Sequence, residues 1–251
     1  MLVLSKESFG QVFYNQNNRI GNIQLYEPNT AQVAVLQSIN ENVDFLTLQV
    51  GYTPIKYLSF SGGYVFKQNQ TKDNFRSKSK GEFSLAVGTY YFMETVKREK
   101  SGAKIIPSDI GVLFTANLGY SKTGIDHFLR DDSVLELAYS SIFLQLGMYI
   151  KFELGQVGMS YTHNRTIYNK LVISRDYPPV IVREAGRIFE NKSVFWPNTV
   201  NVEVQIGVKR LRGLGGVKFP GKDFFRSNII SPGNDFLYLG LVVEIFKKEQ
   251  S

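Results

Sequence analysis

The sequence predicts an all-β protein, a transmembrane antiparallel up-and-down β-barrel of ten strands. Three observations predict this fold. Apolar and polar residues alternate with a period of two in run after run, the polar positions hold mostly small uncharged residues, and no apolar stretch is long enough for a transmembrane helix. Residues 199–209 show the alternation without a break, with valines opposed to Asn201, Glu203 and Gln205. Such a segment is a strand with two unlike faces.

The predicted strands follow one another to the C-terminal end of the chain. They are residues 32–39, 46–52, 58–67, 82–91, 110–120, 142–151, 155–162, 199–209, 211–219 and 236–246. The runs 32–39 and 211–219 are the weakest, and without them the barrel would have eight strands.

Loop lengths favour ten strands over eight. Outer-membrane barrels have short periplasmic turns and long external loops. With ten strands, the long loops 69–79, 121–134, 169–197 and 220–235 all fall outside, and both termini are periplasmic. Only the connection 95–108 departs from this pattern. With eight strands the asymmetry would be reversed.

The composition of the polar face favours a membrane barrel over a soluble one. A soluble sandwich gives the same alternation, but its solvated face is normally rich in charge. Here glycine recurs on the polar face, at positions 51, 63, 88, 111, 119, 147, 158, 207 and 240. Small side chains suit the crowded lumen of a narrow barrel, so the apolar face is expected to meet lipid. Tyrosines near the strand ends suit an aromatic girdle: Tyr52, Tyr91, Tyr120 and Tyr161.

Global composition agrees with one exported barrel domain. The 251 residues divide into an N-terminal extension, 1–31, and a barrel, 32–247. Zero cysteines exclude disulfides and thiolate metal sites, and a net charge of +7 scattered over loops argues against nucleic-acid binding. Met1 to Leu4 is too short for the apolar part of a signal peptide, so an export signal is expected to have been removed or replaced.

Three glutamates fall on the predicted lumen face: Glu82, Glu203 and Glu244. Buried carboxylates are costly unless they are paired, so basic residues are expected to reach inward to them. The candidates are Lys67, Lys151, Lys209 and Arg165. Such a network predicts a filled, closed lumen rather than an ion path.

Catalysis is not expected. The chain has two histidines, and the side chains of Ser160 and His163 fall on opposite faces of their strand. His127 lies near Asp126, Asp131 and Asp132 in a segment expected to be a solvated external loop. The sequence therefore predicts no catalytic, metal or cofactor residues.

Three stretches carry a family resemblance: 26–30 with 51–58, 118–128, and 239–246. They read YEPNT with GYTPIKYL, LGYSKTGIDHF, and LGLVVEIF, and they resemble a family of small outer-membrane barrel proteins, often lipoproteins, of Bacteroidota. The chain departs from that family in lacking a lipobox cysteine and in the long basic connection 94–108. The last stretch also resembles the signal by which assembly machinery captures a closing strand, with Gly240, Val243, Ile245 and Phe246 as its residues.

The predicted function is that of a non-enzymatic structural or accessory subunit in the cell outer membrane, in contact with lipid and with protein partners. The candidate partner-binding loop is 169–197, because aromatic and arginine residues are typical of interface anchors. Its residues of this kind are Arg183, Arg187, Phe189, Phe195 and Trp196. The alternatives are a small outer-membrane pore and a soluble ligand-binding barrel.

Overall fold

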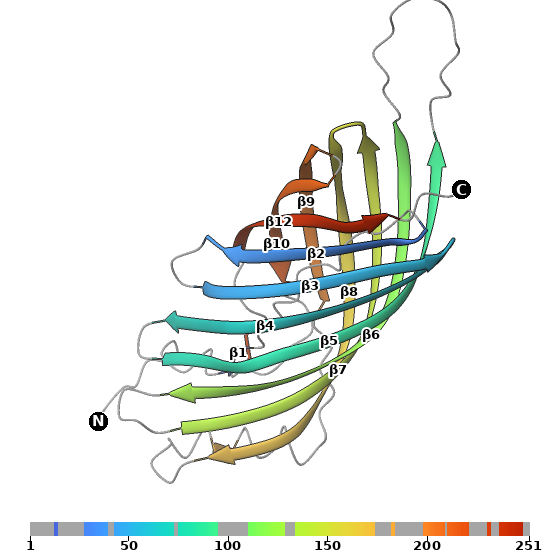
Figure 1. Ribbon diagram of the computed structural model, residues 1–251. Helices are drawn as coiled ribbons and strands as arrows, with labels where there is room; N and C mark the ends of the chain where they lie inside the picture. The colour runs from blue at the N-terminus through green and yellow to red at the C-terminus, as the bar shows by residue number, and fades with distance from the viewer. Residues whose placement is uncertain are drawn as a thin grey trace, which may run out of the picture.

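Ten strands close into one antiparallel barrel (Figure 1). The computed structural model describes residues 13–14, 28–39, 43–72, 75–94, 110–128, 134–173, 182–183, 198–208, 210–220, 230–231 and 236–247. The barrel strands are β2 (Thr30–Ser38), β3 (Val43–Ile55), β4 (Leu58–Lys72), β5 (Phe75–Glu94), β6 (Gly111–Phe128), β7 (Val134–Phe152), β8 (Gly155–Ile173), β9 (Asn198–Val208), β10 (Leu211–Pro220) and β12 (Phe236–Lys247). The ten-strand prediction is confirmed, weak runs included, and the eight-strand alternative is wrong.

Two further short strands were not predicted. β1 (Phe13–Tyr14) pairs in parallel with β11 (Ile230–Ser231) in a separate two-stranded sheet. β11 belongs to the connection between β10 and β12, so this pair joins the N-terminal part of the chain to that connection.

Closure brings the first and last barrel strands together. β12 pairs with β2 from Tyr238 opposite Ser38 to Lys247 opposite Thr30. Thr30 also lies opposite Thr53 of β3, next to the turn at Lys56 and Tyr57. The barrel end that holds this turn, Glu153–Leu154 and Arg210 is called the turn end below, and the opposite end is called the far end. That the turn end faces the periplasm remains a prediction.

The barrel wall is much taller on one side. Strands β4 to β8 have 15, 20, 18, 19 and 19 residues. Strands β2, β9, β10 and β12 have 9, 11, 10 and 12 residues. The far-end part of β4 to β8 is called the raised wall below. Much of the predicted loops 69–79 and 121–134, and the start of 169–197, is therefore strand.

The alternation fades in the raised wall because polar side chains enter its outer face. Lys122, Ser140 and Arg165 stand on the outer face where Val112, Leu146 and Val157 stand nearer the turn end. The hydrogen-bonded ladder continues through this change, with Gly124 opposite Ala138 and Phe128 opposite Val134. A prediction based on apolar residues along one face therefore ends each strand where the apolar face ends, although the strand itself continues.

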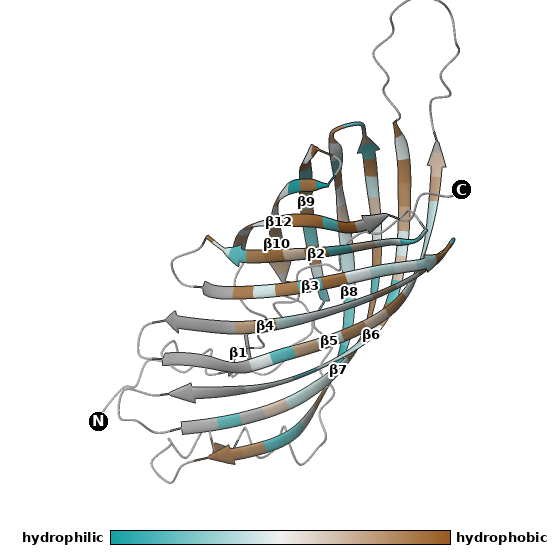
Figure 2. Cartoon of the chain, in the orientation of Figure 1, coloured by the Kyte–Doolittle hydropathy of each residue, from teal (hydrophilic) through white to brown (hydrophobic). Residues whose placement is uncertain are grey.

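The outer surface nearer the turn end is an apolar belt. On β6 it runs from Val112 to Tyr120, and on β7 from Ile142 to Ile150. Leu118, Leu146 and Ile206 are 56%, 48% and 56% exposed on it. The belt is about as tall as a transmembrane strand, about 9–11 residues, and far exceeds the apolar patches of soluble proteins. Figure 2 shows the apolar and polar bands alternating along these strands. The chain is a membrane-spanning barrel, and the soluble alternative is wrong.

Among the described residues, no helix is long and apolar enough to cross a bilayer.

Candidate functional site in the barrel lumen

One side of the lumen is lined by a chain of polar side chains. Asn117 Nδ2 donates to Gln145 Oε1 at 3.4 Å, and Gln145 Nε2 donates to Ser160 Oγ at 3.3 Å. Asn201 Nδ2 donates to the same Ser160 Oγ at 3.3 Å. The chain crosses β6, β7, β8 and β9, because side chains at paired positions lie on the same face. It ties four neighbouring strands together inside the barrel.

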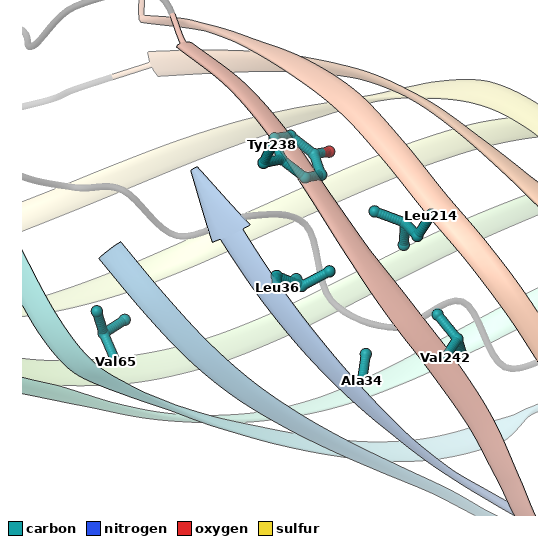
Figure 3. Packing of buried hydrophobic residues seen from close by; sticks show 6 residues of the cluster. All are labelled: Ala34, Leu36, Val65, Leu214, Tyr238 and Val242. Atoms are coloured by element: carbon teal, nitrogen blue, oxygen red, sulfur yellow. The ribbon is translucent and has the colours of Figure 1, made fainter. Parts of the chain in front are cut away.

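The opposite side of the lumen contains an apolar cluster. A buried cluster there comes from β2, β4, β10 and β12: Ala34, Leu36, Val65, Leu214, Tyr238 and Val242 (Figure 3). Leu36, Tyr238 and Val242 are each at most 2% exposed. Apolar and polar side chains therefore share the lumen, because Gln32 of β2 and Gln49 of β3 are also buried on this side. The prediction of a mainly small and polar interior missed the large apolar side chains.

A buried carboxylate sits in one register row across five strands. Glu203 of β9 lies between Gly158 of β8 and Gly216 of β10. Beyond these glycines lie Tyr149 of β7 and Tyr238 of β12. The Tyr238 hydroxyl donates to Glu203 Oε2 at 3.3 Å, and Tyr149 has an electrostatic interaction with the same carboxylate. Glu203 is 4% exposed, so these contacts compensate for its loss of water.

The glycines of the lumen make room for aromatic rings. A Cβ on Gly216 would overlap the ring of Tyr238, and a Cβ on Gly119 would overlap the ring of its cross-strand partner Phe143. Phe143, Tyr149 and Tyr238 are all less than 2% exposed. The sequence analysis noted the small residues and missed the rings that cover them. The sequence does hold a signal for these rings. Each aromatic residue lies an even number of positions from a glycine of its own strand, and so on the same face as that glycine.

The predicted lumen residues have different surroundings. Glu82 and Glu203 are 3% and 4% exposed, and Glu244 is half-buried on the same face as Val242. Lys151 Nζ lies 5.3 Å from the ring centroid of Phe92. The Lys67 side chain and Lys209 lie outside the described residues. Arg165 is exposed on the outer face, opposite Ile142, so it does not reach inward.

Lys218 is a lumen cation that the sequence analysis missed. It is 1% exposed and lies opposite Asn201, two positions from Gly216 on the same strand. Lys218 and Glu203 are therefore diagonal neighbours on adjacent strands.

The residues predicted for partner binding and assembly are only partly described. Arg183 is exposed, whereas Arg187, Phe189, Phe195 and Trp196 lie outside the described residues. In β12, Gly240 faces the lumen, and Val243 and Ile245 are 42% and 57% exposed on the outer face. The Phe246 side chain lies outside the described set. That these residues form an assembly signal remains a prediction.

Ser160 and His163 lie on opposite faces of the barrel wall, whereas Asp131, Asp132 and the His127 side chain lie outside the described residues. Ser160 is 1% exposed inside the lumen, whereas the His163 Nδ1 lies 2.7 Å from Asn198 Oδ1 on the other face of the wall. Within the described ranges, no group of three His, Asp or Glu side chains could hold a metal ion.

Comparisons with known proteins assign no family to this chain. No family model and no curated protein matches the sequence. Among solved structures, the chain is similar to the translocator domain of autotransporter NalP from Neisseria meningitidis, with 11% identity over 85% of this chain and 86% of that chain and a TM-score of 0.31. The case for an outer-membrane type of barrel is therefore made from the closed strand order and apolar belt of this chain.

Proposed function

We propose that this chain is a non-enzymatic outer-membrane barrel that acts as a structural or accessory subunit of a membrane protein complex. The observation that carries the proposal is the raised wall: β4 to β8 continue well beyond the apolar belt on one side of the barrel only. A strand of 19 residues is much longer than the roughly 9–11 residues that cross a bilayer. Its extra length offers a rigid protein surface in water.

The outer face of the raised wall has the chemistry of a polar contact surface. Lys170 Nζ pairs with Glu136 Oε1 at 3.1 Å, and Asn169 Nδ2 donates to Ser140 Oγ at 3.0 Å. Together with exposed Arg165, these four residues are called the wall patch below. β8 ends at Ile173, three residues after Lys170, and the connection 174–197 with its arginine and aromatic residues follows in the sequence. Patch and connection together form the proposed partner surface.

Co-purification from membranes tests the proposal. Replacing 174–197 by a Gly and Ser linker just long enough to return from Ile173 to Asn198, which lies opposite His163, should leave a heat-resistant barrel, because this shortening changes the closure entropy little. The same change should remove one or more partners that the intact protein recovers. Lys170→Glu should weaken the recovery of partners. The matched double variant Glu136→Lys, Lys170→Glu keeps an ion pair with its two charges exchanged, so it separates the effect of losing the ion pair from the effect of changing the charge at position 170. Full recovery of every partner by the shortened protein, or no partner with the intact one, overturns the proposal.

A small pore is the second candidate, favoured by one observation. Several buried lumen side chains, such as Gln156, have polar atoms without a hydrogen-bond partner among the described residues. Polar atoms of this kind suit a hydrated interior. Purified protein in liposomes distinguishes the candidates, because conductance steps from the intact chain favour the pore.

A further inference from the structure

Strand β8 extends well beyond the part of it that pairs with β9. It pairs with β7 as far as Ile173, whereas its pairing with β9 ends at His163, opposite Asn198. Among the described residues, no strand pairs with β8 from Thr166 to Ile173 on the side away from β7. This side of Thr166–Ile173 is called the β8 edge below. It is about 26 Å long at the usual rise per residue, so it has room for a strand of average length.

A proline explains why the ladder between β8 and β9 stops at Asn198. Gly207 N donates to the carbonyl oxygen of Leu154 at 2.8 Å, so these two residues form a hydrogen-bonded pair. Such pairs recur at every second position of an antiparallel ladder. The first one beyond Asn198 would join Asn164 to Pro197, and proline has no N–H to donate. Proline at this position therefore opposes an extension of the β9 ladder along β8.

Backbone groups at the β8 edge can pair with an added strand. In a strand, the N–H and C=O groups point alternately to the two neighbouring strands. Because Leu154 points its carbonyl toward β9, the backbone groups of Thr166 and Tyr168 point to the β8 edge. The outward side chains of β8 change from Tyr161 in the belt to Arg165 above it, so this edge lies in water rather than in lipid. A sheet edge in water is a template for one more strand, held by ladder hydrogen bonds.

The outer side chains next to this edge are aliphatic and cationic. Ile167 and Val172 are 37% and 47% exposed. Arg165 is exposed, and the Lys170 side chain is 55% exposed, against 27% for its ion-pair partner Glu136. The accessible charge is therefore mainly positive. Side chains opposed across two strands interact, so an added strand would complement this face with acidic and aliphatic side chains.

A second copy of this chain does not fit the β8 edge. Two such edges paired antiparallel about a twofold axis would leave the barrels pointing in opposite directions, which one membrane does not allow. Parallel pairing about the membrane normal would set the outer face of one edge beside the lumen face of the other. Each edge also carries Arg165 and Lys170, and like charges opposed across two strands are destabilising. These arguments favour a strand from a different protein.

We propose that the β8 edge binds an extended segment of a partner protein as an added strand, with acidic and aliphatic side chains on the outer face of that segment. This inference rests on the proposed function, because it states how a partner recognises the raised wall. The two can fail separately, since a partner can depend on the connection 174–197 without pairing with β8.

Co-purification with two variants of one residue gives the first test. Tyr168→Pro removes the N–H that points to the β8 edge, at a position where an edge strand tolerates proline, and Tyr168→Ala keeps that N–H. Both variants remove the ring, so they differ in the backbone donor. We expect both to give heat-resistant barrels, and Tyr168→Pro to recover about tenfold less of at least one partner than Tyr168→Ala. Equal recovery overturns the inference and leaves the proposed function standing if shortening 174–197 still removes a partner. No partner with the intact protein overturns both.

Photocrosslinking in intact cells gives a second test that needs no proline. Ile167 or Val172 is replaced by p-benzoylphenylalanine, and Lys122, exposed on β6 two strands away, is the matched control position. Both edge positions should attach to one short segment of the same partner, because an added strand lies about 4.8 Å from β8, and the control position should not attach to that segment. Attachment to scattered partner sites, to the connection 174–197 or to a second copy of this chain overturns the inference, as does no attachment from either edge position.

Discussion

A lysine in the centre of the apolar belt should destabilise the barrel far more than a lysine on the raised wall. Leu146 is the middle outward residue of the β7 belt and is 48% exposed there. A lysine at the bilayer midplane of a barrel costs about 2–4 kcal/mol, and the cost falls to about 0–1 kcal/mol near the interface. We therefore expect Leu146→Lys to lower the folding equilibrium constant by about 30–1000-fold, since about 1.4 kcal/mol is tenfold. Ser140→Lys, on the same strand and face, should change it little.

Folding into lipid vesicles at increasing urea concentration measures this difference. The folded fraction is followed by the gel mobility shift between heated and unheated samples, which reports a closed barrel. Ser140 accepts only an exposed hydrogen bond from Asn169, so its loss adds little. If the urea concentrations at the midpoint of folding are equal for the two variants, whether both are lower than in the unchanged protein or neither is, Leu146 does not face lipid at mid-depth.

Three further outcomes are expected. Gly216→Ala should lose about 1–3 kcal/mol in the same urea titration, because its Cβ overlaps the Tyr238 ring, while Gly213→Ala, whose Cβ would make only an ordinary van der Waals contact with the Ile206 carbonyl oxygen, should lose little. Tyr238→Phe should cost about 1–3 kcal/mol by removing the donor to Glu203, and Glu203→Gln in that background should recover part of it; no recovery would contradict the contact. An epitope tag after Ser251 should be protected from antibody on intact cells, and surface labelling would reverse the predicted orientation.

The number of strands and the faces of most strands could be predicted from the sequence. Alternation assigns Val204 outward and Gln205 inward, and they are 38% and 1% exposed. The prediction succeeds because lipid on one side and a crowded lumen on the other impose opposite demands on neighbouring residues. Loop asymmetry then recovers the weak strands β2 and β10, whose own patterns are poor.

The height of the wall could not be predicted in the same way. Above the belt the outer faces of β6 and β7 become polar at Lys122 and Ser140, so the outward apolar signal ends although the backbones still pair. Cross-strand hydrogen bonding depends on the neighbouring strand, and composition read along one strand does not report it.

The Glu203 row shows what register adds to alternation. Period two places Tyr149, Gly158, Glu203, Gly216 and Tyr238 on the lumen face, but each belongs to a different strand. Only the cross-strand register puts them in one row, with a glycine on each side of the carboxylate and a tyrosine beyond each glycine. Shifting β10 by one residue would replace Gly216 by an outward-facing neighbour and break the contact from Tyr238. The row therefore links lumen packing to register, and so the small residues serve to fix strand pairing as well as to save space.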